Sequence, residues 1–378
     1  MEKTDKKVLI YTLVFLIIIF FVLTLIGAFS VEVIKVFEFP WHISKTPFLD
    51  VWAKWDSGYF MDIATKGYSY SPDNPKFQNV VFFPLYSIIL KIINSVVKSI
   101  LVTGILVSNF FLFLSLIILF KLVKLEIKNE NIAKNSLIYL LIFPTSFFFL
   151  AVYSESLFLF NILATFYFLK KDNLKLVSIF GVLTSLTKSI GFMIIVPLIY
   201  FAIKNKFELR KIFYILVIPV GTLIFLSYLY INFGLTPLEL ISIEEKAWER
   251  NPWYNLENIN KFFSNIYDIL FLKEFSIKSL KLIYIINLNF VIIATLLIIY
   301  STKILKDKIY LIYSLTFLFS PIILGHIVAM TRFVIILFPV YIALASIKNS
   351  IINNIIKFVS ISFLIILFMM FVNWFAIY

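Results

Sequence analysis

A few ionisable side chains stand out because the chain around them is apolar. Asp56 lies in an aromatic, glycine-containing stretch, Glu155 follows a long apolar run, Lys188 separates two apolar blocks, and Arg332 lies in the short segment GHIVAMTRF. Charges inside or at the edge of membrane spans are costly, so each is a functional candidate. A carboxylate can act as a general base toward a hydroxyl, and cations can stabilise a leaving phosphate. These residue types therefore predict proton transfer beside an anion site.

Each of these residues also has a structural alternative. Glu155 and Lys188 could pair with each other inside a helix bundle, and Arg332 could extend to lipid head groups. Asp62 could be a solvated acid or a helix cap, and His326 could hydrogen-bond the backbone of a turn. Four tryptophans could form an interfacial belt: Trp52, Trp55, Trp248 and Trp253. Convergence of the polar residues on one face would favour function.

Composition identifies an integral membrane protein. The chain has 378 residues, of which 61% are hydrophobic, and a mean hydropathy of +0.99. Because a spanning helix needs about 20 apolar residues, this length predicts a single domain, 1–378, of about ten or eleven transmembrane helices. The net charge of +13 is explained by basic loops on one membrane face and does not indicate nucleic-acid binding.

The sequence lacks the residues and motifs of several common kinds of catalytic and binding site. Cysteine is absent, which excludes disulfides and thiolate metal sites. There is no Walker A loop, no GxGxxG, and no zinc-ligand spacing. A Ser-His-Asp grouping is also missing, since His42 and His326 are the only histidines.

The loops divide into two sets that predict the orientation. Those with a basic excess are expected to face the cytoplasm, with the N-terminus: 121–135, 170–175, 204–211, 303–308 and 348–357. The other set is expected outside: a first loop at 29–79, the 144–155 turn, the Lys188 region, a second large loop at 232–278, and the 325–332 turn. For this alternation to hold, the apolar block 80–97 is predicted to be re-entrant or surface-lying. All the candidate residues then share the extracytoplasmic face.

Several stretches together resemble the PIG-V type mannosyltransferases, which add the second mannose in GPI synthesis, and their prokaryotic relatives. The first matching stretch along the chain is WAKWDSGYFMDIATKGYS, followed by VVFFPLYSIIL. Four further stretches follow in order: FPTSFFFLAVYSESLFLFNILATFYFL, SLTKSIGFMIIVPL, FGLTPLELISIEEKAWER and AMTRFVIILFPVYIALA. The similarity covers residues 52–345, and its elements are specific in combination. Lys188 departs from the arginine that relatives usually carry, so a cation remains without the planar fork.

The resemblance implies a GT-C fold, in which the first outer loop bears short surface helices and a catalytic aspartate. It also implies inverting transfer of a hexose, typically mannose, from a polyprenyl- or dolichyl-phosphate donor to a hydroxyl of a glycolipid or glycan acceptor. Asp56 matches the catalytic aspartate and is the predicted general base. Lys188, Arg250 and Arg332 are the predicted donor-phosphate ligands.

The remaining candidates are polar and aromatic residues of the same face, which could line the sugar and acceptor site: Trp55, Tyr59, Asp62, Tyr68, Glu155, Trp248 and His326. No DxD pair is present, and we expect no metal and no other cofactor, because cations can neutralise a lipid phosphate. The main alternative is a lipid or glycan transporter without transfer chemistry. It is disfavoured because no repeat halves are found and the polar residues gather at one face.

Overall fold

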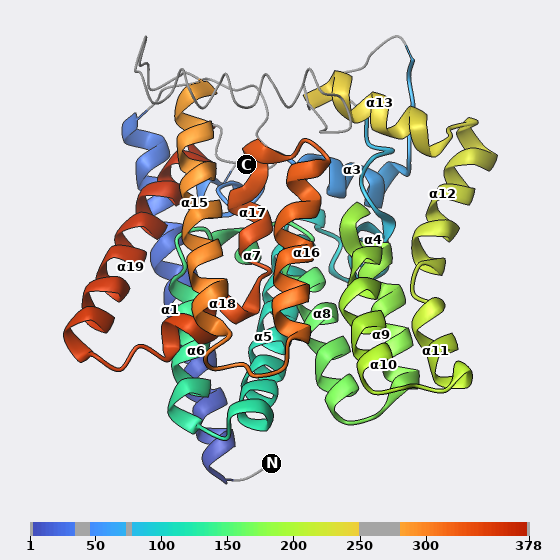
Figure 1. The fold of residues 1–378 in the computed structure, drawn as a ribbon. Coiled ribbons are helices and arrows are strands. Elements are labelled where there is room, and N and C mark those ends of the chain that lie inside the picture. Colours follow the sequence, from blue (N-terminus) through green and yellow to red (C-terminus); the bar gives the residue numbers. More distant parts are fainter. Residues whose placement is uncertain (1–2, 35–45, 73–77, 249–279, 376–378) are drawn as a thin grey trace.

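The computed structural model describes residues 3–34, 46–72, 78–248 and 280–375, which are helical with connecting turns and contain no strand. The elements, labelled in Figure 1, are α1 (Lys3–Ile34), α2 (Pro47–Asp50), α3 (Ser57–Lys66), α4 (Pro84–Val97), α5 (Ile100–Ile127), α6 (Glu130–Ile142), α7 (Phe147–Leu150), α8 (Glu155–Lys170), α9 (Leu174–Thr187), η1 (Ser189–Ile194), α10 (Ile195–Lys204), α11 (Leu209–Leu216), α12 (Val220–Phe233), α13 (Pro237–Trp248), α15 (Leu280–Ser301), α16 (Ile309–Ile323), η2 (Ile327–Ala329), α17 (Met330–Val334), α18 (Phe338–Ala345) and α19 (Ser350–Val372).

Several helices have the length and composition of membrane spans. In the described part, α1, α5, α15 and α19 meet both criteria, and the count rises to six if the bent pairs α11–α12 and α17–α18 each form one span. The pairs bend by 41° and 60°, respectively. The chain is therefore a multi-pass, all-helical membrane protein. The expected ten or eleven crossings would also require shorter apolar helices to cross, and this count stays a prediction.

Three of the basic loops meet at the end of the bundle where the chain begins (Figure 1). Lys124 lies 2.6 Å from Asp5 of α1. Lys170 lies 3.3 Å from Glu126 and 2.9 Å from Asp307. These ion pairs join the ends of α1, α5 and α8 to the α15–α16 turn, so these loops share one face as the charge pattern indicates.

The segment that leads to α3 is packed deep between helices at the opposite end. The indole of Trp52 is fully buried, and its Nε1 donates to Thr24 Oγ1 at 2.9 Å. Its ring stacks on Phe20 of α1 and contacts Phe368 of α19. Val152 donates its backbone N–H to the Trp52 carbonyl at 2.9 Å. Trp52 is thus a core residue rather than part of an interfacial belt.

Helix α4 covers this segment from the side. It begins at Pro84, whose fixed φ suits a first helical turn. Its 14 residues contact α5, α3 and α9, and they are fewer than the roughly 20 that a spanning helix needs. That length is compatible with the predicted re-entrant or surface-lying position, which stays a prediction.

Candidate active site

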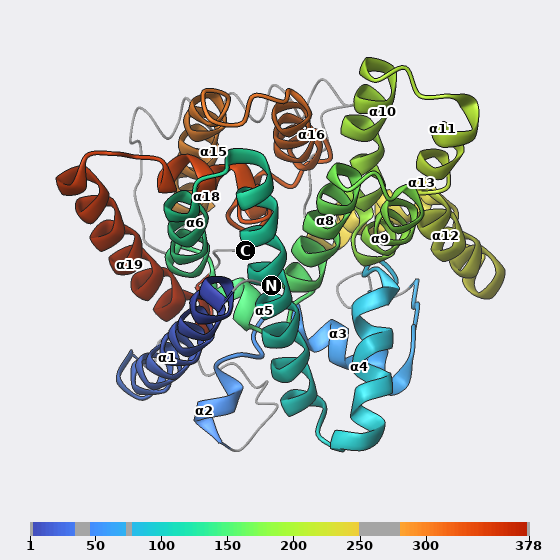
Figure 2. The same cartoon turned by 90° about the horizontal axis from the view of Figure 1, so that it is seen from below.

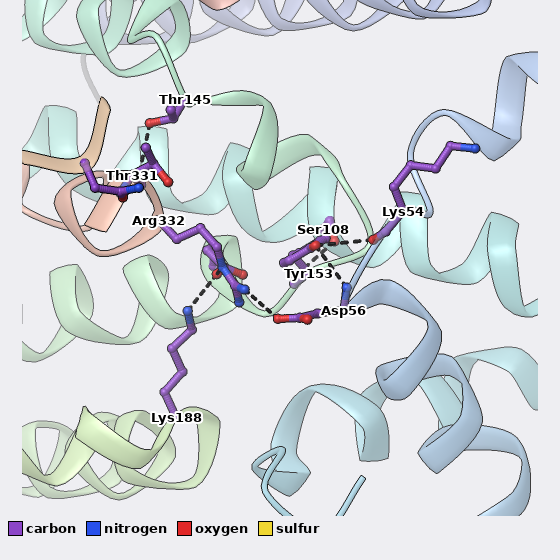
Figure 3. Close-up of polar contacts among 10 residues, drawn as sticks. Lys54, Asp56, Ser108, Thr145, Tyr153, Lys188, Thr331 and Arg332 are labelled. Atoms are coloured by element: carbon purple, nitrogen blue, oxygen red, sulfur yellow. Dashed lines mark hydrogen bonds and ion pairs between the residues drawn. The ribbon is translucent and has the colours of Figure 1, made fainter. Parts of the chain in front are cut away.

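Four charged side chains from distant parts of the chain form a continuous ionic network (Figure 3). Arg332 Nη1 lies 2.5 Å from Asp56 Oδ2, and Arg332 Nε lies 2.9 Å from Glu155 Oε1. The same Glu155 oxygen accepts a hydrogen bond from Lys188 Nζ at 2.7 Å. The order along the network is therefore Asp56, Arg332, Glu155, Lys188. Four residues that the sequence assigns to one face are in direct contact. The Glu155–Lys188 pair, which the sequence left open as a structural alternative, is present.

Solvent access falls from Asp56 to Glu155. The side chain of Asp56 is 19% exposed, that of Arg332 13%, that of Lys188 11%, and that of Glu155 0%. Two carboxylates and two cations make the network neutral overall. Because a buried charge requires a close partner, this pairing allows the four groups to lie inside the bundle. Asp56 is thus the more exposed of the two carboxylates.

Backbone geometry at the start of α3 directs Asp56 toward Arg332. Trp55 has φ 54°, a left-handed conformation that is costly for a residue with a bulky side chain. Its indole Nε1 donates to the Phe371 carbonyl at 3.2 Å, which holds this conformation. Asp56 occupies the N-cap position of α3, but its side chain makes no capping hydrogen bond. Its carboxylate is therefore committed to the ionic network.

Tyr153 links the two acidic segments. Its hydroxyl accepts a hydrogen bond from the Asp56 backbone N–H at 3.1 Å and donates one to the Lys54 carbonyl at 3.2 Å. The Arg332 guanidinium carbon lies 4.8 Å from the centre of its ring, a cation–π distance. A single buried phenol thus supports both Asp56 and Arg332.

Arg332 is positioned by the residue before it. Thr331 accepts a hydrogen bond at its carbonyl from Thr145 Oγ1, at 2.9 Å. Its backbone N–H donates to Asn287 Oδ1 at 2.8 Å. These contacts hold the short helix α17 between α15 and the break after α6, where Pro144 follows the end of the helix. The unusual backbone of this region is tolerated because protein groups satisfy its polar atoms.

Lys188 lies at the junction of α9 and η1 in an extended conformation. Three residues later, an added Cβ on Gly191 would lie 2.1 Å from the Thr184 carbonyl oxygen, so only glycine fits this close approach. The turn that results directs the lysine toward Glu155. Its ammonium also lies 5.7 Å from the Phe158 ring centre and 5.4 Å from that of Phe333.

Tyr59 lies beside Asp56, whereas two other first-loop candidates stabilise the loop. The Tyr59 ring stacks on Phe82, and burial, followed by the charge of Asp56, raises the pKa of Tyr59 to about 12. Tyr59 therefore stays protonated at neutral pH and can donate a hydrogen bond. Asp62 instead pairs with Lys66 at 2.9 Å. The Tyr68 hydroxyl donates to the Phe82 carbonyl at 2.7 Å.

The remaining candidates come from the 325–332 turn and from the second large loop. His326 lies next to α13, with Nε2 3.7 Å from Glu244 Oε2, and its ring contacts Phe333. It is buried and adjoins the segment that carries Arg332. Trp248 is the last residue of α13, and Arg250 lies outside the described residues. The proposed roles of Trp248 and Arg250 stay predictions.

Sequence reasoning missed a second buried ion pair, in the segment just before Asp56. Lys54 Nζ lies 2.6 Å from Asp50 Oδ2, and both side chains are almost fully buried. The ammonium also lies 5.4 Å from the Trp374 ring centre. The i, i+4 spacing was visible in the sequence, but the surrounding polar loop gave no sign of burial. Nothing in the sequence marked Tyr153 as a site residue except its position two residues before Glu155.

The residues near the network do not form an obvious metal site. Across the described ranges, no group of three or more His, Cys, Asp and Glu side chains could hold a metal ion. Instead, Glu155 Oε2 and the hydroxyls of Ser57 and Ser154 are buried with no hydrogen-bond partner in that part of the chain. Buried polar atoms without a protein partner mark places where a bound hydroxyl or water can bond.

The helical architecture and the buried acid–cation network define a polytopic membrane protein with a charged site inside its helix bundle. A comparison with protein families then matches residues 6–376 to the family described as Mannosyltransferase (PIG-V). The chain belongs to this family and is a membrane glycosyltransferase. A search of curated proteins returns no match.

Proposed function

We propose that the enzyme transfers mannose from a polyprenyl- or dolichyl-phosphate donor to a hydroxyl of a glycolipid or glycan acceptor. The reaction takes place at the extracytoplasmic face, opposite the basic loops that meet near the N-terminus, because such loops face the cytoplasm. Asp56 is the general base. The observation that carries this proposal is Arg332, which bridges the accessible carboxylate of Asp56 and the buried carboxylate of Glu155.

Charge balance supports a coupled role for Asp56 and Arg332. In a lipid-linked sugar the phosphate carries one negative charge, and the released lipid phosphate carries about two. Protonation of Asp56 by the acceptor turns the neutral network into one of charge +1 as this second negative charge develops. The protonated acid also binds Arg332 less strongly, so the guanidinium becomes available to the phosphate when it is most needed.

The transfer is a single displacement. The acceptor oxygen attacks C1 of the mannose while its proton passes to Asp56. The bond between C1 and the phosphate oxygen breaks, and its electron pair remains on the phosphate beside Arg332 and Lys188. Direct attack opposite the leaving group inverts C1. A double displacement would require a second carboxylate to attack C1. Glu155 does not suit that role, because it is fully buried and bound to two cations.

Glu155 and the nearby rings hold the sugar in this proposal. Glu155 Oε1 orients both cations, and Oε2, which has no hydrogen-bond partner among the described residues, accepts a sugar hydroxyl. Tyr59, which lies beside Asp56, donates a hydrogen bond to the substrate, and Trp55 provides an aromatic face. The prenyl chain lies in the apolar surroundings of the bundle.

The direct test is a transfer assay with purified full-length protein and radiolabelled polyprenyl-phosphate mannose. Acceptors of different classes are added separately, and the label is followed from the donor lipid to the product. The anomeric configuration of the product is read by NMR. Release of label only in the presence of an acceptor hydroxyl, with inversion, supports the proposal. A lipid that crosses the membrane without release of label would indicate a transporter instead.

Replacement of Arg332 is expected to weaken donor binding. Because a hydrogen bond to a charged group contributes roughly 1.5–3 kcal/mol, Arg332→Ala should raise the donor Kd by about 10- to 100-fold. Arg332→Lys keeps the positive charge but loses the planar fork of the guanidinium, so its donor Kd should lie between those of the unchanged protein and Arg332→Ala. Equilibrium binding of a labelled donor measures this effect. The matched control is Arg210→Ala, because Arg210 is an exposed arginine of α11. An unchanged donor Kd in Arg332→Ala would show that Arg332 does not bind the donor phosphate.

Chelation is expected to leave transfer unchanged. Two cations adjoin the proposed phosphate position, so charge neutralisation does not require a divalent ion. Initial rates are compared in EDTA, after extensive dialysis against EDTA, and with Mg²⁺ or Mn²⁺ restored. Loss of activity with recovery on addition of one metal would contradict the metal-independent mechanism.

A further inference from the structure

Helices α1 and α6 lie side by side at the end of the bundle opposite α3 (Figures 1 and 2). A groove lies between them. It has a volume of about 490 Å³. Residues at helical spacing line it from both sides: Lys7, Tyr11 and Phe15 from α1, and Glu130, Lys134 and Ile138 from α6. The groove takes no part in the transfer mechanism proposed above.

The groove is charged at one end and apolar at the other. The ion pair between Asp5 and Lys124 places the start of α1 beside the end of α5, and α6 begins immediately after α5. Both helices therefore run inward from the same end. At 1.5 Å per residue, Phe15 lies roughly 12 Å deeper than Lys7 along α1. A polar rim above an apolar floor matches the profile of a lipid lying in one leaflet.

The rim carries a net positive charge and remains accessible. Lys134 pairs with Glu130 at 2.6 Å, but their side chains are 42% and 39% exposed. Lys7 is exposed and adds a second cation, which gives two positive charges against one negative. Tyr11 lies one helical turn deeper than Lys7 and is 72% exposed. Tyrosine rings are favoured at the membrane interface. An anionic head group is thus favoured over a zwitterionic one.

From these observations we propose that the α1–α6 groove binds an anionic glycerophospholipid. The phosphate contacts Lys7 and Lys134, and one acyl chain follows Phe15 and Ile138 into the groove. Basic pockets between membrane helices on the cytoplasmic side bind acidic lipid head groups in this way. The inference is independent of the donor, the acceptor and the transfer activity.

The test is native mass spectrometry of the full chain in detergent, with phosphatidylglycerol or phosphatidylcholine of identical acyl chains. Phosphatidylglycerol should bind more tightly. Because a lysine near the surface contributes about 1 kcal/mol, Lys7→Gln and Lys134→Gln should each weaken it by about five-fold, and the double variant by about 25-fold. Glu130→Gln should strengthen it, since it removes the negative charge from the rim. Lys6→Gln, on the same turn but outside the lining, should have little effect.

The contribution of the apolar floor is tested with Ile138→Trp, which fills the groove and should weaken phosphatidylglycerol without a change in charge. Glycerol phosphate, which lacks acyl chains, should not compete. The inference is overturned if Lys6→Gln loses as much lipid as Lys7→Gln, if both lipids bind equally, or if Ile138→Trp has no effect. The first of these outcomes would indicate unspecific attraction by the basic N-terminus.

Discussion

Asp56→Asn is expected to lower the rate of mannosyl transfer by about 10²- to 10⁴-fold, the range that a general base contributes. The asparagine side chain has nearly the same shape, and Asp56 makes no capping hydrogen bond that would be lost. Donor binding should be retained or tightened, because the network gains one unit of positive charge and Arg332 loses one of its two carboxylate partners. Single-turnover transfer and equilibrium donor binding measure the two effects separately.

A matched control for this variant is Asp172→Asn. Asp172 is exposed in the α8–α9 turn and has φ 52°, a conformation that asparagine also tolerates. Near-normal turnover in Asp56→Asn would exclude Asp56 as the base. A loss of donor binding that equals the loss of rate would instead assign Asp56 to binding alone.

Glu155→Gln is expected to cause the largest loss of stability. Glu155 is fully buried between Arg332 and Lys188, and its amide replacement would leave two buried cations with only Asp56 to compensate them. Removal of one partner from a buried ionic group costs roughly 3–5 kcal/mol. Thermal unfolding in detergent, followed by tryptophan fluorescence, measures the loss.

A charge-balanced double variant tests whether compensation is the cause. Glu155→Gln with Lys188→Met restores a neutral network, and we expect it to be more stable than Glu155→Gln alone by about 2 kcal/mol or more. Additive losses in the double variant would contradict this explanation. They would indicate that Glu155 stabilises the fold through packing rather than through its charge.

The sequence predicts the membrane class and four members of the network for one physical reason. Charges are so costly in an apolar chain that Glu155, Lys188 and Arg332 are conspicuous, and the alternation of basic loops assigns them to one face with Asp56. Which atom contacts which could not be predicted, because the contacts join segments that are far apart in the chain. The bridge from Arg332 to both acids is visible only in the structure.

The first loop shows where sequence reasoning is least reliable. Trp52 and Lys54 belong to a polar, aromatic stretch, yet both side chains are buried. Trp52 is enclosed by α1 and α19, which lie at opposite ends of the chain. Lys54 is enclosed by Asp50 and by Trp374, which follows α19. Asp62 and Tyr68 were predicted from the same composition, but the contacts described for them hold the loop itself. Composition identifies such a loop without separating the residues that contact substrate from those that stabilise it.

The sequence separations within the ionic network determine the order in which the enzyme can be completed during synthesis. Glu155 and Lys188 are 33 residues apart and can pair as soon as α8 and α9 have inserted. Asp56 and Arg332 are 276 residues apart, so Asp56 lacks this partner until residue 332 of the 378 has been synthesised. Since synthesis proceeds from the N-terminus, chains that stop short of Arg332 cannot assemble the four-residue network. Formation of the complete ionic network is thereby tied to insertion of the segment that carries Arg332.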